Sequence, residues 1–210
     1  MINTSIRDNY KNGLVGQFLI DNIKTKSKLS IVSAYFTIYA YQKLKNQLDE
    51  IEHLNFLFGE PTFIKAIDPN KVNKRDYKIE DDKLVIHIES QLKQKSVSKE
   101  CAEWIRTKVD IKSMVKPNFL HGKMYHIKQE SGLETAIIGS SNFTVNGLGL
   151  GGSPNIELNL VIDSDRDRKD LINWFTELWN DETGIVEDVK EKVLKYLGQL
   201  YAENEPEFIY

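Results

Sequence analysis

The chain has 210 residues, 40% hydrophobic and 28% charged, with a formal net charge of −3, which suits one well-buried domain. No stretch approaches the ~18 unbroken apolar residues of a membrane span, and the start lacks a secretory signal's apolar core, so we expect a cytoplasmic protein outside the membrane. The single cysteine, Cys101, excludes an intrachain disulfide, and the four histidines lack metal-ligand spacing, so we expect neither metal nor cofactor.

The first sixty residues alternate between helical and extended patterns. Apolar residues at helical spacing predict a helix over residues 12–26. A β-branched strand over 28–36 follows, then a helix that Thr37 can cap, then a strand over 54–58. Strand, helix and strand in this succession form a βαβ unit, which favours parallel pairing.

The rest of the chain continues to mix strands and helices. After a charged loop over 61–82, the predicted elements are a strand at 83–89, a helix at 96–108, strands at 109–115, 120–128, 135–138 and 155–163, a helix capped by Ser164, and a last amphipathic helix from about Val186. We therefore predict an α/β fold with a mixed, largely parallel central sheet and helices on both faces.

Polar side chains concentrate on three of these β-prone runs. His121 and Lys123 are two residues apart, so on a strand both would point to the same side, and Ser140 and Asn142 repeat this spacing. A neutral imidazole is a good nucleophile, an ammonium neutralises a phosphoryl oxygen, and hydroxyl and amide groups can hold the other oxygens. Glu157 could accept the imidazole's second proton. These groups suggest cleavage of phosphate esters.

Together the runs resemble the phospholipase D superfamily motif, His-x-Lys, then Asp, then Gly-Ser-x-Asn. The matching residues are His121, Lys123, Gly139, Ser140 and Asn142, and Glu157 follows where many members carry an acidic residue. The family's Asp, five positions beyond the Lys, is Lys128 here. The context is similar to single-motif versions in restriction-type nucleases and at the front of bacterial helicase-like proteins.

The resemblance implies an α/β/α sandwich, a metal-independent phosphodiesterase and a phosphohistidine intermediate. His121 would be the nucleophile, Glu157 would orient it, and Lys123, Gly139, Ser140 and Asn142 would bind phosphate. Because the chain carries one motif, we expect a homodimer in which both histidines face one phosphate. We expect residues 1–183 to form the catalytic domain and 184–210 to be a C-terminal helix and acidic tail, a possible link to a further domain.

Charge is distributed unevenly along the chain. Residues 61–128 hold 15 Lys and Arg against 9 Asp and Glu, whereas residues 129–210 hold 6 against 16. The basic segment 61–128, which includes the residues that lead to the motif, favours DNA over lipid as the substrate. Two alternatives stay open: a non-catalytic DNA-binding or dimerisation module of a helicase, which Lys128 would favour, and a phospholipase-type lipid phosphodiesterase. The glycine-rich segment 146–154 could gate the site.

Overall fold

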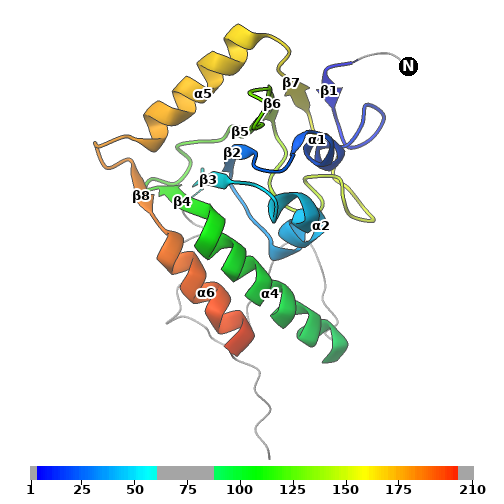
Figure 1. The fold of residues 1–210 in the computed structure, drawn as a ribbon, viewed down its shortest axis with the longest axis vertical. Coiled ribbons are helices and arrows are strands. Elements are labelled where there is room, and N and C mark those ends of the chain that lie inside the picture. The colour runs from blue at the N-terminus through cyan, green and yellow to red at the C-terminus, as the bar shows by residue number, and fades with distance from the viewer. Residues whose placement is uncertain (1–3, 61–87, 203–210) are drawn as a thin grey trace, which may run out of the picture.

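A mixed β-sheet forms the centre of the protein in the computed structural model, which describes residues 4–60 and 88–202. Within these residues the sheet has eight strands in the order β1-β7-β6-β5-β2-β3-β4-β8. The strands are β1 (Ile6–Arg7), β2 (Lys28–Ser33), β3 (His53–Phe58), β4 (Val109–Met114), β5 (Lys123–Lys128), β6 (Glu134–Gly139), β7 (Asn159–Val161) and β8 (Val186–Asp188). The helices are α1 (Val15–Asn22), α2 (Ile38–Leu48), α4 (Ile88–Lys108), α5 (Asp165–Trp179) and α6 (Lys190–Ala202). Figure 1 shows their arrangement.

The predicted α/β fold with a mixed sheet is confirmed, but parallel pairing does not dominate it. Only β2 with β3 and β3 with β4 are parallel; the other five neighbouring pairs are antiparallel. The chain leaves β4 at the edge where β2 and β3 also end and turns straight into β5, which must therefore run the other way. A short hairpin then joins β5 to β6, and such a connection permits only antiparallel pairing.

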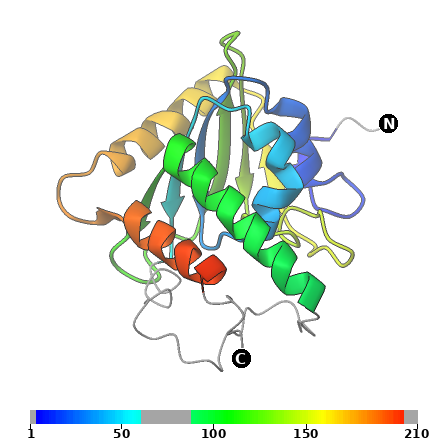
Figure 2. The same cartoon turned by 60° about the horizontal axis from the view of Figure 1, so that its bottom comes forward.

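Helices cover both faces of the sheet, as predicted. On one face α1, α2, α4 and α6 bury a large core against alternate strand residues such as Ile31, Phe56 and Tyr125. On the other face α5 buries Phe175 against residues of opposite parity, including Val32 and Met124. In Figure 2 α5 lies behind the strands and the other helices lie in front. Because successive side chains point to opposite faces and both faces are covered, the central strands carry buried apolar residues on both sides.

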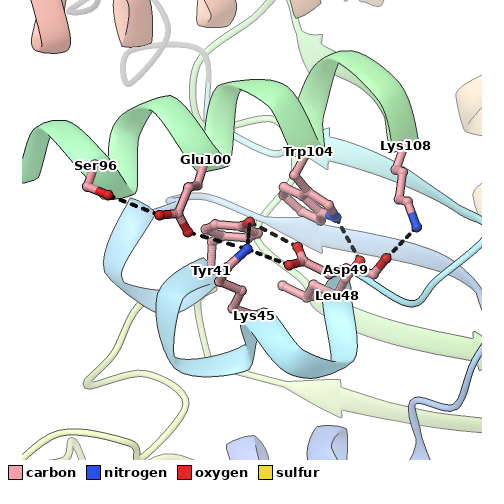
Figure 3. Close-up of polar contacts among 8 residues, drawn as sticks. All are labelled: Tyr41, Lys45, Leu48, Asp49, Ser96, Glu100, Trp104 and Lys108. Carbon is pink, nitrogen blue, oxygen red and sulfur yellow. Dashed lines mark hydrogen bonds and ion pairs between the residues drawn. The ribbon is translucent and has the colours of Figure 1, made fainter.

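Polar contacts hold α4 against α2 (Figure 3). The indole N–H of Trp104 donates to the carbonyl of Leu48 at 2.9 Å, and the ammonium of Lys108 donates to the carbonyl of Asp49. Carbonyls at a helix C-terminus lack intrahelical partners, and a cation there also complements the helix dipole. The contacts thus satisfy the end of α2 and fix the helix that leads directly into β4.

Several element boundaries differ from the prediction. Thr37 and Ser164 cap α2 and α5 as predicted, each accepting a backbone N–H. The predicted loop 61–82 and most of strand 83–89 lie outside the described residues, while Ile88 and Glu89 begin α4. Val186 belongs to strand β8 instead of a helix.

Residues 184–202 pack with the rest of the described chain. Strand β8 extends the sheet beside β4, and α6 buries Val193 and Leu197 in the larger core. The boundary proposed at residue 183 therefore separates segments that share one sheet. Among the described residues, no helix is both long and apolar enough to cross a membrane.

Candidate phosphate-ester site

The motif residues meet at one edge of the sheet, although 38 positions separate His121 from Asn159 in the printed sequence. Lys123 begins β5 and pairs with Gly139, the last residue of β6, which pairs in turn with Asn159, the first of β7. On the other side Met124 pairs with Val32, so Ser33 at the end of β2 lies at the level of Lys123. Strand register therefore brings Lys123, Gly139 and Asn159 to the same level of the sheet.

His121 lies in the irregular segment before β5, not on the strand as predicted. Its ring is exposed and its Nε2 lies 3.3 Å from the carbonyl oxygen of Asn118. A carbonyl can only accept, so this contact places the proton of a neutral ring on Nε2 and leaves the Nδ1 lone pair available. Lys123 donates from Nζ to the carbonyl of His121 at 2.8 Å. This hydrogen bond holds the Lys123 ammonium against the backbone of His121.

Ser140 and Glu157 form the acidic side of the site. The Ser140 hydroxyl donates to a Glu157 carboxylate oxygen, and its oxygen accepts the backbone N–H of Leu158 at 3.1 Å. Both residues are described by the structure, and no hydrogen bond joins the Glu157 carboxylate to the His121 ring. Its predicted role in orienting that ring therefore remains a prediction.

Asn142 is oriented by the end of β2. Its side-chain oxygen accepts the backbone N–H of Ala34 at 3.0 Å, and the hydroxyl oxygen of Ser33 lies 3.3 Å from the same atom. The amide NH₂ makes no hydrogen bond to any residue that the structure describes. Because the oxygen is engaged, the group that remains to meet an anion is a donor, as phosphate binding requires.

Buried Ser33 ties residues 140–143, which we call the motif loop, to β2. The sequence analysis did not identify Ser33. Its hydroxyl donates to the carbonyl of Tyr35 at 2.7 Å and accepts the N–H of Phe143 at 2.9 Å. Phe143 also stacks on Phe36, with ring centroids 5.4 Å apart. A serine that follows the apolar pair Ile31 and Val32 at the end of a buried strand was the available signal.

Asn159 anchors the other side of the same loop and was also missed. Its side chain accepts the N–H of Ser141 at 3.2 Å and donates to the Ser141 hydroxyl and to the carbonyl of Arg7. The Tyr125 hydroxyl donates to the carbonyl of Ser141 at 2.8 Å. Burial raises the pKa of Tyr125 well above its usual value, and nearby Glu157 raises it further, so the phenol stays a neutral donor. These contacts preorganise the loop.

Gly139 is required by strand packing. A Cβ built on it would lie 2.2 Å from the carbonyl oxygen of Leu158 and 2.5 Å from the side-chain oxygen of Asn159. The absence of a side chain therefore lets the segment before β7 approach β6. The predicted contact of Gly139 with phosphate remains a prediction.

The first part of the glycine-rich segment is anchored, which argues against a gate there. Gly147, Leu148 and Gly149 are buried, and Asn9 donates from its side chain to the carbonyl of Gly147 at 2.8 Å. The carbonyl of Leu148 accepts the N–H of Gly16 at 2.7 Å. The exposed part is confined to residues 152–154.

Lys128, which replaces the family's Asp, lies at the opposite end of β5. It is five residues from Lys123, roughly 16 Å along a strand, and its Nζ pairs with Glu134 at 3.0 Å. His126, on the same face, is buried with its Nε2 3.2 Å from Glu134. Burial lowers the pKa of His126, and the bond to Glu134 only partly offsets this. Neither side chain reaches the site edge.

No group of three or more potential metal ligands occurs among the residues that the structure describes.

Comparisons with known proteins bear on the family and the fold of this chain. Residues 19–179 match the family model described as "Cardiolipin synthase, PLD-like domain". Polyphosphate kinase from Porphyromonas gingivalis is similar in fold, with a TM-score of 0.51 at 9% identity over 85% of this chain and 22% of that one. Phosphatidylserine synthase from Haemophilus influenzae Rd KW20 gives a TM-score of 0.48 at 12% identity over 92% of this chain and 43% of that one.

The chain thus spans less than half the length of either of these solved structures. No curated protein matches the sequence. The family model, in contrast, covers well over half of the chain and includes every motif residue. The chain belongs to the phospholipase D-like domain family.

Proposed function

We propose that this domain is a metal-independent phosphodiesterase that cleaves DNA through a phosphohistidine on His121, within a homodimer. The observation that carries the proposal is the convergence at one sheet edge of His121, Lys123, Ser140 and Asn142. An exposed imidazole beside a cation and two oriented polar groups suits in-line attack on a phosphodiester. Membership of the phospholipase D-like family supports the same reaction type.

The reaction needs two proton-transfer partners. A His121 ring nitrogen attacks phosphorus, the bond to the leaving oxygen breaks, and an acid must protonate that oxygen. Water then attacks the phosphohistidine, a base takes its proton, and the bond to His121 breaks. Among the described residues His121 is the only histidine at this edge, since His53 and His126 lie elsewhere on the sheet. We assign the acid and base role to the partner subunit's His121.

Lys123 and Asn142 would hold the non-bridging oxygens. Lys123 supplies a positive charge next to the nucleophile, and Asn142 presents its NH₂ group. Donors already in place gain strength as charge develops on those oxygens. Glu157, held by Ser140, adds a carboxylate that can stabilise a protonated imidazole.

DNA is the substrate class that the charge distribution favours. The basic segment 61–128 leads to the motif, although residues 61–87 lie outside the described part. On the resemblance alone, we further propose that this domain is part of a restriction or helicase-like protein. A lipid phosphodiesterase is the second candidate, favoured by exposed apolar side chains beside the site, such as Phe119 and Ile156, and by the family model's description.

The test is cleavage of single- and double-stranded DNA and of phospholipid vesicles in excess EDTA. Wild type is compared with His121→Ala and with His53→Ala, which alters a half-exposed histidine at the other end of the sheet. We expect DNA cleavage that only His121→Ala abolishes, and a covalent DNA adduct that is stable to base and labile to acid in quenched reactions.

Two results would contradict this reading. Cleavage of lipid but not DNA would support the second candidate, a lipid phosphodiesterase. DNA binding without cleavage by any variant would instead indicate the non-catalytic module.

A further inference from the structure

Two aromatic side chains are exposed on the side of the candidate site where β2, β3 and β4 end. Tyr35 follows the last residue of β2 by two positions and is 47% exposed. Phe119 precedes His121 by two positions and is 56% exposed. Exposed apolar residues that occur singly are ordinary, but two aromatic residues at the same edge as a candidate site indicate a binding surface.

Backbone contacts at the strand ends hold these two residues in neighbouring segments. The Ser33 hydroxyl donates to the carbonyl of Tyr35 at 2.7 Å, and the Ser33 carbonyl accepts the N–H of Gly59 at 3.0 Å. Gly59 in turn lies against the residue that follows Phe119, because a Cβ built on it would be 2.7 Å from the carbonyl oxygen of Leu120. The segments that carry the two rings therefore meet at the ends of β2 and β3.

These segments lie between two cationic side chains. Lys123 begins β5, which borders β2, and exposed Lys116 follows the end of β4, which borders β3. The carboxylate of Glu60 lies on this side too, where it accepts the N–H of Asn118 at 3.3 Å. With the usual strand spacing, the edge from β5 across to β4 spans about 14 Å. Cations and rings along one edge match a nucleic acid strand, in which phosphates and bases alternate.

We propose that Tyr35 and Phe119 form a subsite for unpaired nucleobases, so that this domain acts on single-stranded DNA. The ligand class rests on the proposed function, because the phosphate that Lys123 and Asn142 would hold is taken to be that of DNA. Every base has a π-face, so aromatic rings bind unpaired bases whatever their sequence. The bases of a duplex are stacked on one another, so their faces are not open to these rings.

Charge at the two ends of the edge decides on which side of the site the strand would lie. On the β7 side are Asp8 and Glu157, whose backbones are joined by a hydrogen bond of 3.0 Å. A polyanion is repelled by these carboxylates and attracted by Lys116 and Lys123. The strand would therefore extend from His121 over the ends of β2, β3 and β4, where the two aromatic residues lie.

A base and an acyl chain make different demands on these two positions. Contact with an acyl chain requires only apolar area, which leucine supplies as well as an aromatic residue does. Stacking of a base requires the flat face of a ring. Substitution of both aromatic residues by leucine therefore distinguishes a nucleobase subsite from a surface that binds lipid.

The test is fluorescence anisotropy in excess EDTA, with His121→Ala in every protein so that the probe stays intact. The probes are an oligothymidylate of about 12 nucleotides, the same strand without bases, and the corresponding duplex. Tyr35→Leu with Phe119→Leu removes both rings. Tyr35→Phe with Phe119→Tyr keeps both rings and is the matched control. Tyr10→Leu removes a ring that is 64% exposed beyond β1, on the acidic side of the site.

We expect the parent protein to bind the unpaired strand at least about tenfold more tightly than the abasic strand or the duplex. Removal of both rings should weaken binding of the unpaired strand about 30-fold or more, as for two stacked bases, and should leave binding of the abasic strand unchanged. The pair that keeps its rings and Tyr10→Leu should bind like the parent. Circular dichroism checks folding, and the abasic comparison needs only the parent protein.

The inference fails if the abasic strand or the duplex binds as tightly as the unpaired strand, or if the leucine pair or Tyr10→Leu contradicts the expected pattern. It also fails if no oligonucleotide binds, and binding of phospholipid vesicles that the leucine pair retains would then assign this surface to lipid.

Cleavage is measured separately with His121 in place. Ring-dependent binding without cleavage by any protein would refute the proposed nuclease activity and leave the subsite. Equal cleavage of single and double strands by wild type and by the leucine pair would refute the subsite alone.

Discussion

The side-chain oxygen of Asn142 accepts the backbone N–H of Ala34 at 3.0 Å, which joins the motif loop to the end of β2. This bond decides which end of the amide remains for a ligand. The oxygen faces the protein, so the NH₂ group is the part that can donate to an anion. The same residue thus has an anchoring atom and a binding atom, which substitutions can separate.

Asn142→Asp should keep the anchor and remove the donor. A carboxylate oxygen can still accept from Ala34, so we expect the free energy of unfolding to change by less than about 0.5 kcal/mol. Phosphodiesterase activity should fall about 100-fold or more, because an acceptor replaces a donor at the anion. Asn142→Ala, which loses both atoms, should also destabilise by about 1–2 kcal/mol in urea denaturation. An active Asn142→Asp enzyme would rule out the donor role.

Gly139→Ala should destabilise the protein whether or not phosphate binds. The new Cβ would lie 2.2 Å from the carbonyl of Leu158, so the strand must shift, which costs about 1–3 kcal/mol. Gly122→Ala is the matched control between His121 and Lys123, because a Cβ there meets no described atom within 4 Å. Thermal unfolding should separate the two variants. Equal stability would mean that the packing of Leu158 on Gly139 is not tight.

Lys128→Asp restores the family residue, and we expect no gain in activity. The side chain faces Glu134 at the end of β5 remote from His121. Exchanging the ion pair for two carboxylates should destabilise by about 0.5–1 kcal/mol, and added salt should reduce the loss. Activity and urea denaturation measured together test this. A tenfold rise in cleavage would instead connect position 128 to the site.

Acidification should destabilise the protein through His126 and then Glu134. Burial lowers the pKa of His126, so between pH 7 and 5 the unfolded chain binds more protons than the folded one, and stability falls as pH falls. Partial burial alone would raise the pKa of Glu134, but hydrogen bonds from Lys128 and His126 outweigh it and lower that pKa. A second loss therefore follows below about pH 4.5.

His126→Gln isolates the first of these losses. This variant keeps a polar side chain near Glu134 but cannot gain a charge, so its stability should vary less between pH 7 and 5 than that of wild type. His53→Gln, at a partly exposed position, controls for replacing a histidine. Denaturation midpoints across pH provide the measurement. Parallel curves for wild type and His126→Gln would exclude His126 as the cause.

Local signals in the sequence determined much of this protein. The caps at Thr37 and Ser164 were predictable because a hydroxyl before an apolar helical repeat satisfies nearby N–H groups. The central strands were predictable from β-branched and apolar runs, because both of their faces are buried. The motif residues were identified by spacing and by resemblance, and strand register places them at one edge.

Only the tertiary structure decided what surrounds them. The roles of Ser33, Asn9 and Asn159 depend on partners more than a hundred positions away, such as Phe143, Gly147 and Arg7, and no local pattern contains such pairs. The mixture of parallel and antiparallel pairs follows from the edge of the sheet at which each connection returns the chain. Packing decides that edge. The exposure of Leu158 and Leu160 is also decided by the tertiary structure, because an apolar strand has the same sequence pattern whether or not a helix covers it.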